Sequence, residues 1–114
     1  MRVVATGTSD NWIYLGHSSN GYGCIPVQPG KTYIASCYVT LPKSLSGRTV
    51  QSQLYIVEHT GKNATNTNHP ASCTVQAEYG TWKRMQVSFT AREQYPYISL
   101  RVDVDLNAVM FFDC

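Results

Sequence analysis

Apolar and polar residues alternate along most of this chain with a period of two. The longest such segment runs from Lys31 to Leu41. One side of it carries Tyr33, Ala35, Cys37, Val39 and Leu41, and the other carries Ile34, Ser36, Tyr38 and Thr40. Successive side chains of a β-strand point to opposite faces, so this pattern predicts strands with one face in the core and one in water. No segment shows the spacing of an amphipathic helix.

Turn-forming residues divide the chain into nine expected strands. These span residues 2–6, 12–15, 22–27, 31–41, 49–58, 73–78, 81–90, 97–104 and 108–113. The apolar positions expected to share their core are Val50, Leu54, Ile56, Met85, Val87, Phe89, Ile98, Leu100, Val102 and Val104. Short alternating strands separated by turns predict an all-β fold, a two-sheet antiparallel β-sandwich of the jelly-roll type.

Three features at the strand ends refine this prediction. Pro29-Gly30 is a turn dipeptide, since proline presets φ and glycine permits a left-handed backbone. The stretch 60–70 is rich in turn formers and lacks an apolar period, so we expect an exposed loop there. Trp82 begins a strand, where its large apolar face can cap one end of the sandwich.

Size and charge limit the function. The 114 residues fit a single domain over 1–114, which we expect to be a fragment of a larger protein. The net charge of +2 comes without a cluster of basic residues, which argues against a nucleic-acid partner. No apolar run is long enough for a membrane helix, so we expect no membrane insertion.

The chain has four cysteines, Cys24, Cys37, Cys73 and Cys114. None of them forms the closely spaced pair that is typical of a zinc site. Two disulfides could form in any of three pairings, and free buried cysteines also behave as small hydrophobic residues. We expect mostly free thiols.

Three segments in fixed order carry a family resemblance: 27–39 with its PGKTY, 80–90 beginning Gly-Thr-Trp, and 109–113 ending Phe-Phe-Asp. Together they resemble the jelly-roll carbohydrate-binding modules (galactose-binding-domain-like) found beside xylan- and cellulose-degrading enzymes. Similar patterns occur in tip domains of phage tail fibres and tailspikes. The resemblance implies a β-sandwich first and sugar binding second, since one fold hosts many functions.

A sugar site needs aromatic faces beside hydrogen-bonding groups. The alternation places such residues away from the core: Tyr38, Gln51, Gln53, Tyr55, Arg101 and Asp103. The resemblance implies that Tyr55 stacks on the sugar, that Arg101 and Asp103 hydrogen-bond to it, and that Gln53 assists. Alternatively, these are ordinary surface residues, with Arg101 and Asp103 forming an ion pair worth about 1 kcal/mol or less. Trp12 and Tyr14 are another candidate surface.

The resemblance also implies a structural calcium ion. Asp113 matches the closing acidic residue of the family's calcium site, whereas nothing in residues 1–11 matches its usual Phe-Glu segment. Asp113 with loop carbonyls or Asp10 could bind the ion, and a solvated surface carboxylate is the competing interpretation.

Catalysis is not expected. Asp103 and Asp105 would lie about 6.6 Å apart on one strand, but glycosidase carboxylates must flank the bond from opposite sides. His17, His59 and His69 lie in turn-rich or strand-end positions, where we expect solvated side chains rather than a nucleophile pair or a metal site.

The sequence therefore predicts a non-catalytic domain that binds an oligo- or polysaccharide such as a cell-surface glycan. The expected setting is a virion, as the receptor-binding part of a phage tail fibre that forms a homotrimer in the parent protein, or the extracellular space. Two alternatives remain, a structural or oligomerisation domain of a fibre and an accessory module of a secreted glycoside hydrolase.

Overall fold

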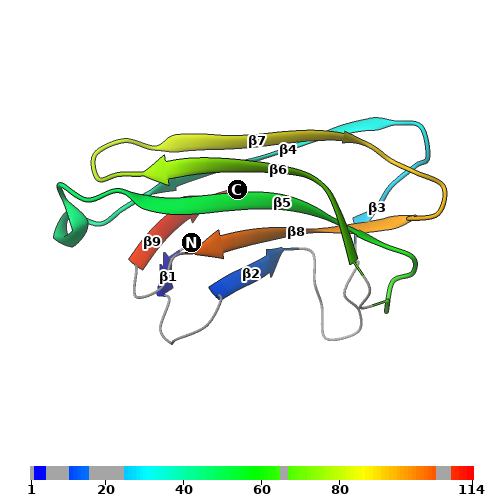
Figure 1. Cartoon of the computed structure of the whole chain (residues 1–114), viewed down its shortest axis with the longest axis horizontal. Helices are drawn as coiled ribbons and strands as arrows, with labels where there is room; N and C mark the ends of the chain where they lie inside the picture. Colours follow the sequence, from blue (N-terminus) through cyan, green and yellow to red (C-terminus); the bar gives the residue numbers. More distant parts are fainter. Residues whose placement is uncertain (1, 5–10, 16–24, 65–66, 105–108) are drawn as a thin grey trace.

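Two antiparallel sheets pack face to face in the computed structural model, which describes residues 2–4, 11–15, 25–64, 67–104 and 109–114 (Figure 1). The strands are β1 (Arg2–Val4), β2 (Asn11–Leu15), β3 (Ile25–Pro26), β4 (Thr32–Thr40), β5 (Val50–His59), β6 (Thr67–Ala77), β7 (Lys83–Thr90), β8 (Tyr97–Val104) and β9 (Val109–Asp113). One short 3-10 helix, η1 (Lys43–Leu45), precedes β5. The predicted all-β sandwich is confirmed.

The strand order defines a four-stranded and a five-stranded sheet. The first has the order β1-β9-β4-β7, and the second has the order β2-β8-β5-β6 with β3 paired to the end of β8. Each described pair of these strands is antiparallel. In Figure 1, β6 and β7 run alongside each other at the edge where the two sheets meet. The outer face of each sheet is therefore a separate surface of the molecule.

The core lies between the sheets and follows the predicted alternation. On β4, Cys37 and Val39 are buried while Ile34 and Tyr38 are exposed. Nine of the ten other positions expected in the core are buried, and the tenth, Leu100, is partly buried against them. Burying one such aliphatic side chain contributes about 1.5 to 3 kcal/mol, so the period-two pattern alone accounts for the layering of the fold.

The turn before β4 forms as its sequence indicates. The Lys31 N–H donates to the Gln28 carbonyl at 3.2 Å, and Gly30 between them has φ of +81°. A type II turn requires this left-handed residue and favours proline before it, as Pro29 provides. The turn thus aligns β4 with its neighbours.

The expected loop over 60–70 is wrong in its second half, because β6 begins at Thr67. Asn68 pairs with Glu58 across the strands, and the register shifts between Ile56 and Glu58. His69 and Pro70 therefore lie opposite Val57 in a bulge, where proline is tolerated because no ladder hydrogen bond is required of it. Asn, His and Pro carry no strand pattern, so the sequence did not indicate this pairing with β5.

The expectation of mostly free thiols is wrong for Cys37 and Cys114, which form a disulfide. This bond joins the middle of β4 to the residue that follows β9, where Tyr38 and Asp113 are already paired. Cys73 is a free thiol, and Cys24 lies outside the described residues. Sequence spacing gave no sign of the bond because the strand pairing creates it.

Candidate functional site

The outer face of the five-stranded sheet carries two rows of polar and aromatic side chains. The strand registers place one row as Tyr14, Arg101, Tyr55 and Ser72, and the next as Trp12, Asp103, Gln53 and Thr74. Each row crosses β2, β8, β5 and β6 in that order. We call these eight residues the polar-aromatic strip.

Arg101 lies at the centre of the strip. Its Nε and Nη2 donate to the two carboxylate oxygens of Asp103 at 2.6 and 2.8 Å. Its guanidinium also lies 4.8 Å from the ring centroids of both Trp12 and Tyr55. Charge-assisted bidentate bonds and cation–π contacts together fix a side chain that is otherwise flexible. The five donors of Arg101 are thus held at a defined place on the sheet.

Tyr55 continues the network towards β6. Its hydroxyl donates to Gln53 Oε1 at 2.7 Å, and Gln53 Nε2 donates to Thr74 Oγ1 at 3.0 Å. The rings of Tyr55 and His69 meet in a T-shaped contact, with centroids 5.6 Å apart. Because Arg101, Tyr55 and Gln53 are each oriented by a neighbour, the centre of the strip is organised before any ligand arrives.

The charges in the strip balance. Hydrogen bonds from Arg101 to Asp103 raise the pKa of the guanidinium further, so it stays cationic beside the carboxylate. Desolvation, followed by the positive charge of Arg101, lowers the pKa of His69 below its ordinary value of 6.5. At neutral pH the strip therefore contains one positive and one negative charge in contact, and the imidazole of His69 beside it is uncharged.

This arrangement suits a ligand with apolar faces and many hydroxyl groups. The carboxylate of Asp103 accepts two bonds from Arg101 and retains further acceptor positions, and Gln53 and Thr74 add donors and acceptors. Trp12, which is 43% exposed, offers ring surface to the solvent. Aromatic surface beside oriented hydrogen-bonding groups is the combination that a saccharide requires.

The five residues predicted to bind the ligand are Tyr38, Gln53, Tyr55, Arg101 and Asp103, and the structure brings the last four of them together. Tyr38 is exposed as expected but lies on β4, which belongs to the other sheet, so it does not join them. Alternation shows which way a side chain points, whereas strand order decides which sheet carries it. Whether any of the five binds sugar stays a prediction.

The prediction missed the roles of Trp12, Thr74 and His69 in this network. The sequence offers Trp12 and Tyr14 only as a separate candidate surface, but β2 pairs with β8 and places them beside Arg101. No local signal gave their partner strand, and none placed His69 on β6.

Asp113 ends β9 as an exposed residue. Within the described parts of the chain, no group of three or more His, Cys, Asp or Glu residues could hold a metal ion. Asp10 lies outside those parts. A calcium ion bound by Asp113 with backbone carbonyls stays a prediction.

The expectation of a solvated His59 is wrong. This residue is 1% exposed at the end of β5, where its Nε2 lies 2.8 Å from Ser99 Oγ and its Nδ1 lies 2.9 Å from the Ala64 carbonyl. The Ala64 carbonyl can only accept a hydrogen bond, so Nδ1 donates to it, and Nε2 accepts a hydrogen bond from the Ser99 hydroxyl. The distance resembles that of a serine nucleophile and its base, yet Ser99 is 0% exposed and out of a substrate's reach. The pair satisfies buried polar groups, and His17 lies outside the described residues.

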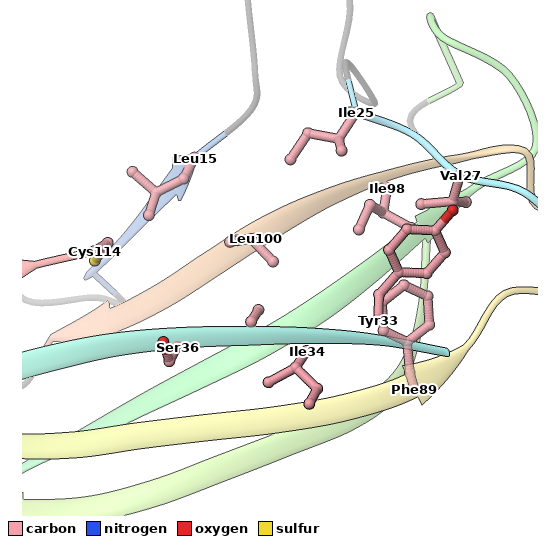
Figure 2. Close-up of a pocket in the computed structure, with 11 residues that line it drawn as sticks. Leu15, Ile25, Val27, Tyr33, Ile34, Ser36, Phe89, Ile98, Leu100 and Cys114 are labelled. Carbon is pink, nitrogen blue, oxygen red and sulfur yellow. The ribbon is translucent and has the colours of Figure 1, made fainter. Parts of the chain in front are cut away.

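Apart from the strip, a hollow lies between the sheets, where β4 faces β8 and the ends of β2 and β3 (Figure 2). Its volume is about 480 Å³, and Leu100, Ile98 and Phe89 contribute to its walls. Figure 2 shows the stacked rings of Tyr33 and Phe89 at one end of it. The Tyr33 hydroxyl accepts the Gln28 N–H at 2.9 Å. This lining is apolar and offers a sugar little to bind.

Three solved structures with the same fold are, or contain, carbohydrate-binding modules. The CBM22-2 xylan-binding domain of Xyn10C from Paenibacillus barcinonensis has a TM-score of 0.59 and 12% identity, over 76% of this chain and 61% of that one. The CBM22-1-GH10 modules of the Clostridium thermocellum endo-1,4-beta-D-xylanase 10B, complexed with xylohexaose, have a TM-score of 0.58 and 14% identity, over 98% of this chain and 24% of that one. A family 16 carbohydrate-binding module has a TM-score of 0.56 and 14% identity, over 99% of this chain and 71% of that one.

This likeness shows the fold, a carbohydrate-binding-module-like sandwich. The chain spans less than two thirds of the length of the first two of these structures. No family model and no curated protein matches the sequence. Within the described residues, no helix is long and apolar enough to cross a membrane.

Proposed function

We propose that this chain is a non-catalytic carbohydrate-binding domain, and that the polar-aromatic strip binds an uncharged oligo- or polysaccharide. The observation that carries the proposal is the register of β2, β8 and β5, which gathers Trp12, Tyr55, Arg101 and Asp103 on one water-facing surface. The similarity to modules whose names specify xylan and xylohexaose supports a sugar ligand.

The charge balance of the strip favours a neutral sugar. Arg101 is already paired with Asp103, so an acidic ligand would have to compete with an existing bidentate ion pair. Hydroxyl groups, in contrast, can use the acceptor positions that Asp103 retains without breaking that pair. A neutral sugar that stacks against the aromatic rings also avoids the free-energy cost of removing a charged group from water.

The decisive experiment is a glycan array followed by calorimetric titration of the best neutral oligosaccharide. We expect Tyr55→Ala and Arg101→Ala each to weaken binding by about tenfold or more, which corresponds to about 1.4 kcal/mol. Tyr38→Ala is the matched control, since it removes an exposed tyrosine from the other sheet. Unchanged affinity in both strip variants would disprove this site.

The array also separates two settings for the same function. The sequence resemblance to tail-fibre tips supports a cell-surface glycan bound outside the cell or on a virion, and the array should then identify a bacterial surface sugar. The xylan-binding structures favour a plant polysaccharide, in which case xylan fragments would bind best.

A structural role makes the opposite prediction for the strip. If the strip is covered by another copy of the chain, light scattering will detect a stable oligomer, and Tyr55→Ala will dissociate it. If the strip binds sugar, Tyr55→Ala will change the affinity for the sugar and leave the molar mass unchanged.

A further inference from the structure

A second exposed aromatic surface lies at one end of the sandwich, around the turn that joins β6 and β7. Trp82 lies in this turn, at an end of the sandwich as predicted. Tyr79 is 46% exposed and Trp82 is 52% exposed, so about half of each side chain is open to the solvent. Gly80 between them has φ of +90°, which allows the tight turn that closes at the Glu78 and Thr81 bridge. The two rings flank a groove of about 450 Å³.

This groove is distinct from the polar-aromatic strip. Its floor includes Thr40 and Phe111, which are paired on β4 and β9 in the four-stranded sheet. Phe111 alternates with buried Met110 and Phe112 and so points outward from that sheet, whereas Thr40 is only 9% exposed and its hydroxyl donates to the Glu78 carbonyl at 3.0 Å. None of the eight strip residues lines the groove.

The groove carries a positive charge. Lys43 of η1 is the charged residue among those that line it, and no carboxylate in the described part of the chain forms an ion pair with it. The adjacent Lys83 is paired with Glu78, with Nζ and Oε1 3.6 Å apart. Exposed Arg2, which pairs with Phe111, and exposed Asp113 at the end of β9 carry opposite charges, and neither of them lines the groove. The strip has no such excess, because Asp103 neutralises Arg101.

The exposed rings of Tyr79 and Trp82, together with the ammonium group of Lys43, favour a ligand that has both an apolar face and a negative charge. A sugar ring can stack its C–H face on Trp82 or Tyr79, and a carboxylate on that sugar can accept charge-assisted hydrogen bonds from Lys43. We propose that this groove is a second saccharide site, specific for acidic sugars of the uronate type. The inference goes beyond the proposed function of the strip and does not depend on it.

The test compares oligogalacturonate with its methyl ester, which has the same sugar rings and no charge. We expect the wild-type domain to bind the acid about tenfold more tightly than the ester in low salt, and this preference to fall as salt is added. Lys43→Gln should reduce affinity for the acid to that for the ester. Trp82→Ala should weaken the binding of both by about tenfold.

Controls distinguish this site from the strip. Tyr55→Ala should leave oligogalacturonate binding unchanged, and Trp82→Ala should leave neutral sugar binding at the strip unchanged. Tyr79→Ala provides a second variant, and thermal unfolding verifies that each variant folds. Equal affinity for acid and ester, no binding of either, or loss of acid binding in Tyr55→Ala would overturn the proposal.

Discussion

Arg101 binds both carboxylate oxygens of Asp103, two residues further along β8, while its guanidinium lies 4.8 Å from the rings of Trp12 and Tyr55. A planar cation with five fixed donors is needed to make all of these contacts together. Lysine offers a single ammonium group and cannot form the bidentate pair or stack as a plane.

Arg101→Lys should therefore impair the strip although it keeps the charge. We expect affinity for the neutral sugar to fall by about tenfold. The free energy of unfolding should fall by about 1 kcal/mol, since the pair is only partly buried. Calorimetric titration and urea unfolding measure these two effects. Arg84→Lys, at an exposed arginine of the other sheet, is the control, and equal effects of the two substitutions would contradict this role of Arg101.

Acidification should destabilise the domain through His69. Its folded-state pKa is lowered by desolvation and by Arg101, and Asp103 opposes this shift. The unfolded chain consequently binds a proton more readily than the folded one. The stability that neutral His69 contributes is full above its ordinary pKa of 6.5, and it is lost as the pH falls through 6.5 towards the lower folded-state value.

The comparison of wild type with His69→Gln isolates this effect from other histidines. Urea unfolding measured across this pH range should show a steeper loss of stability in the wild type than in His69→Gln. Parallel curves for the two proteins would show that His69 does not titrate differently in the folded state.

The sequence predicted the layers of the fold and the direction of most side chains. The alternation of Cys37, Val39 and Leu41 with Tyr38 is a local property of one strand, and burial of the apolar face enforces it. The orientation of Tyr55, Gln53, Arg101 and Asp103 follows from the same rule. These four residues could therefore be selected without coordinates.

Pairing between distant strands could not be obtained in this way. Trp12 reaches Arg101 because β2 is an edge strand beside β8, and Tyr38 is excluded because β4 lies in the other sheet. The disulfide between Cys37 and Cys114 depends on the same long-range pairing of β4 with β9. The position of His69 was missed because the residues around it have no strand-like composition, and they form a strand only through pairing with β5 across a bulge.

The ion pair between Glu58 and Arg92 should be essential for stability. Glu58 is 1% exposed at the end of β5, where Arg92 and the Asn68 amide donate to its carboxylate, the latter at 2.9 Å. Arg92→Ala should lower the urea midpoint more than Glu58→Gln, because it leaves a buried carboxylate without its cation. The double variant Glu58→Gln/Arg92→Ala should be more stable than Arg92→Ala alone. A double variant less stable than both single variants would contradict this account.

Among the interactions that can be removed without disturbing the strip, the disulfide between Cys37 and Cys114 should make the largest contribution to the free energy of unfolding. It closes a loop with a sequence separation of 77 residues, and constraining an unfolded chain over such a loop stabilises the folded state by about 2 to 5 kcal/mol. Cys114→Ser should lower the free energy of unfolding by this amount, and a reducing agent should bring the wild type to the same value. Cys73→Ser is the control because Cys73 is a free thiol. The strip lies on the other sheet, so affinity for the neutral sugar should stay unchanged in Cys114→Ser below its unfolding temperature. A reducing agent that destabilises Cys114→Ser as strongly as the wild type would show that another bond carries the effect.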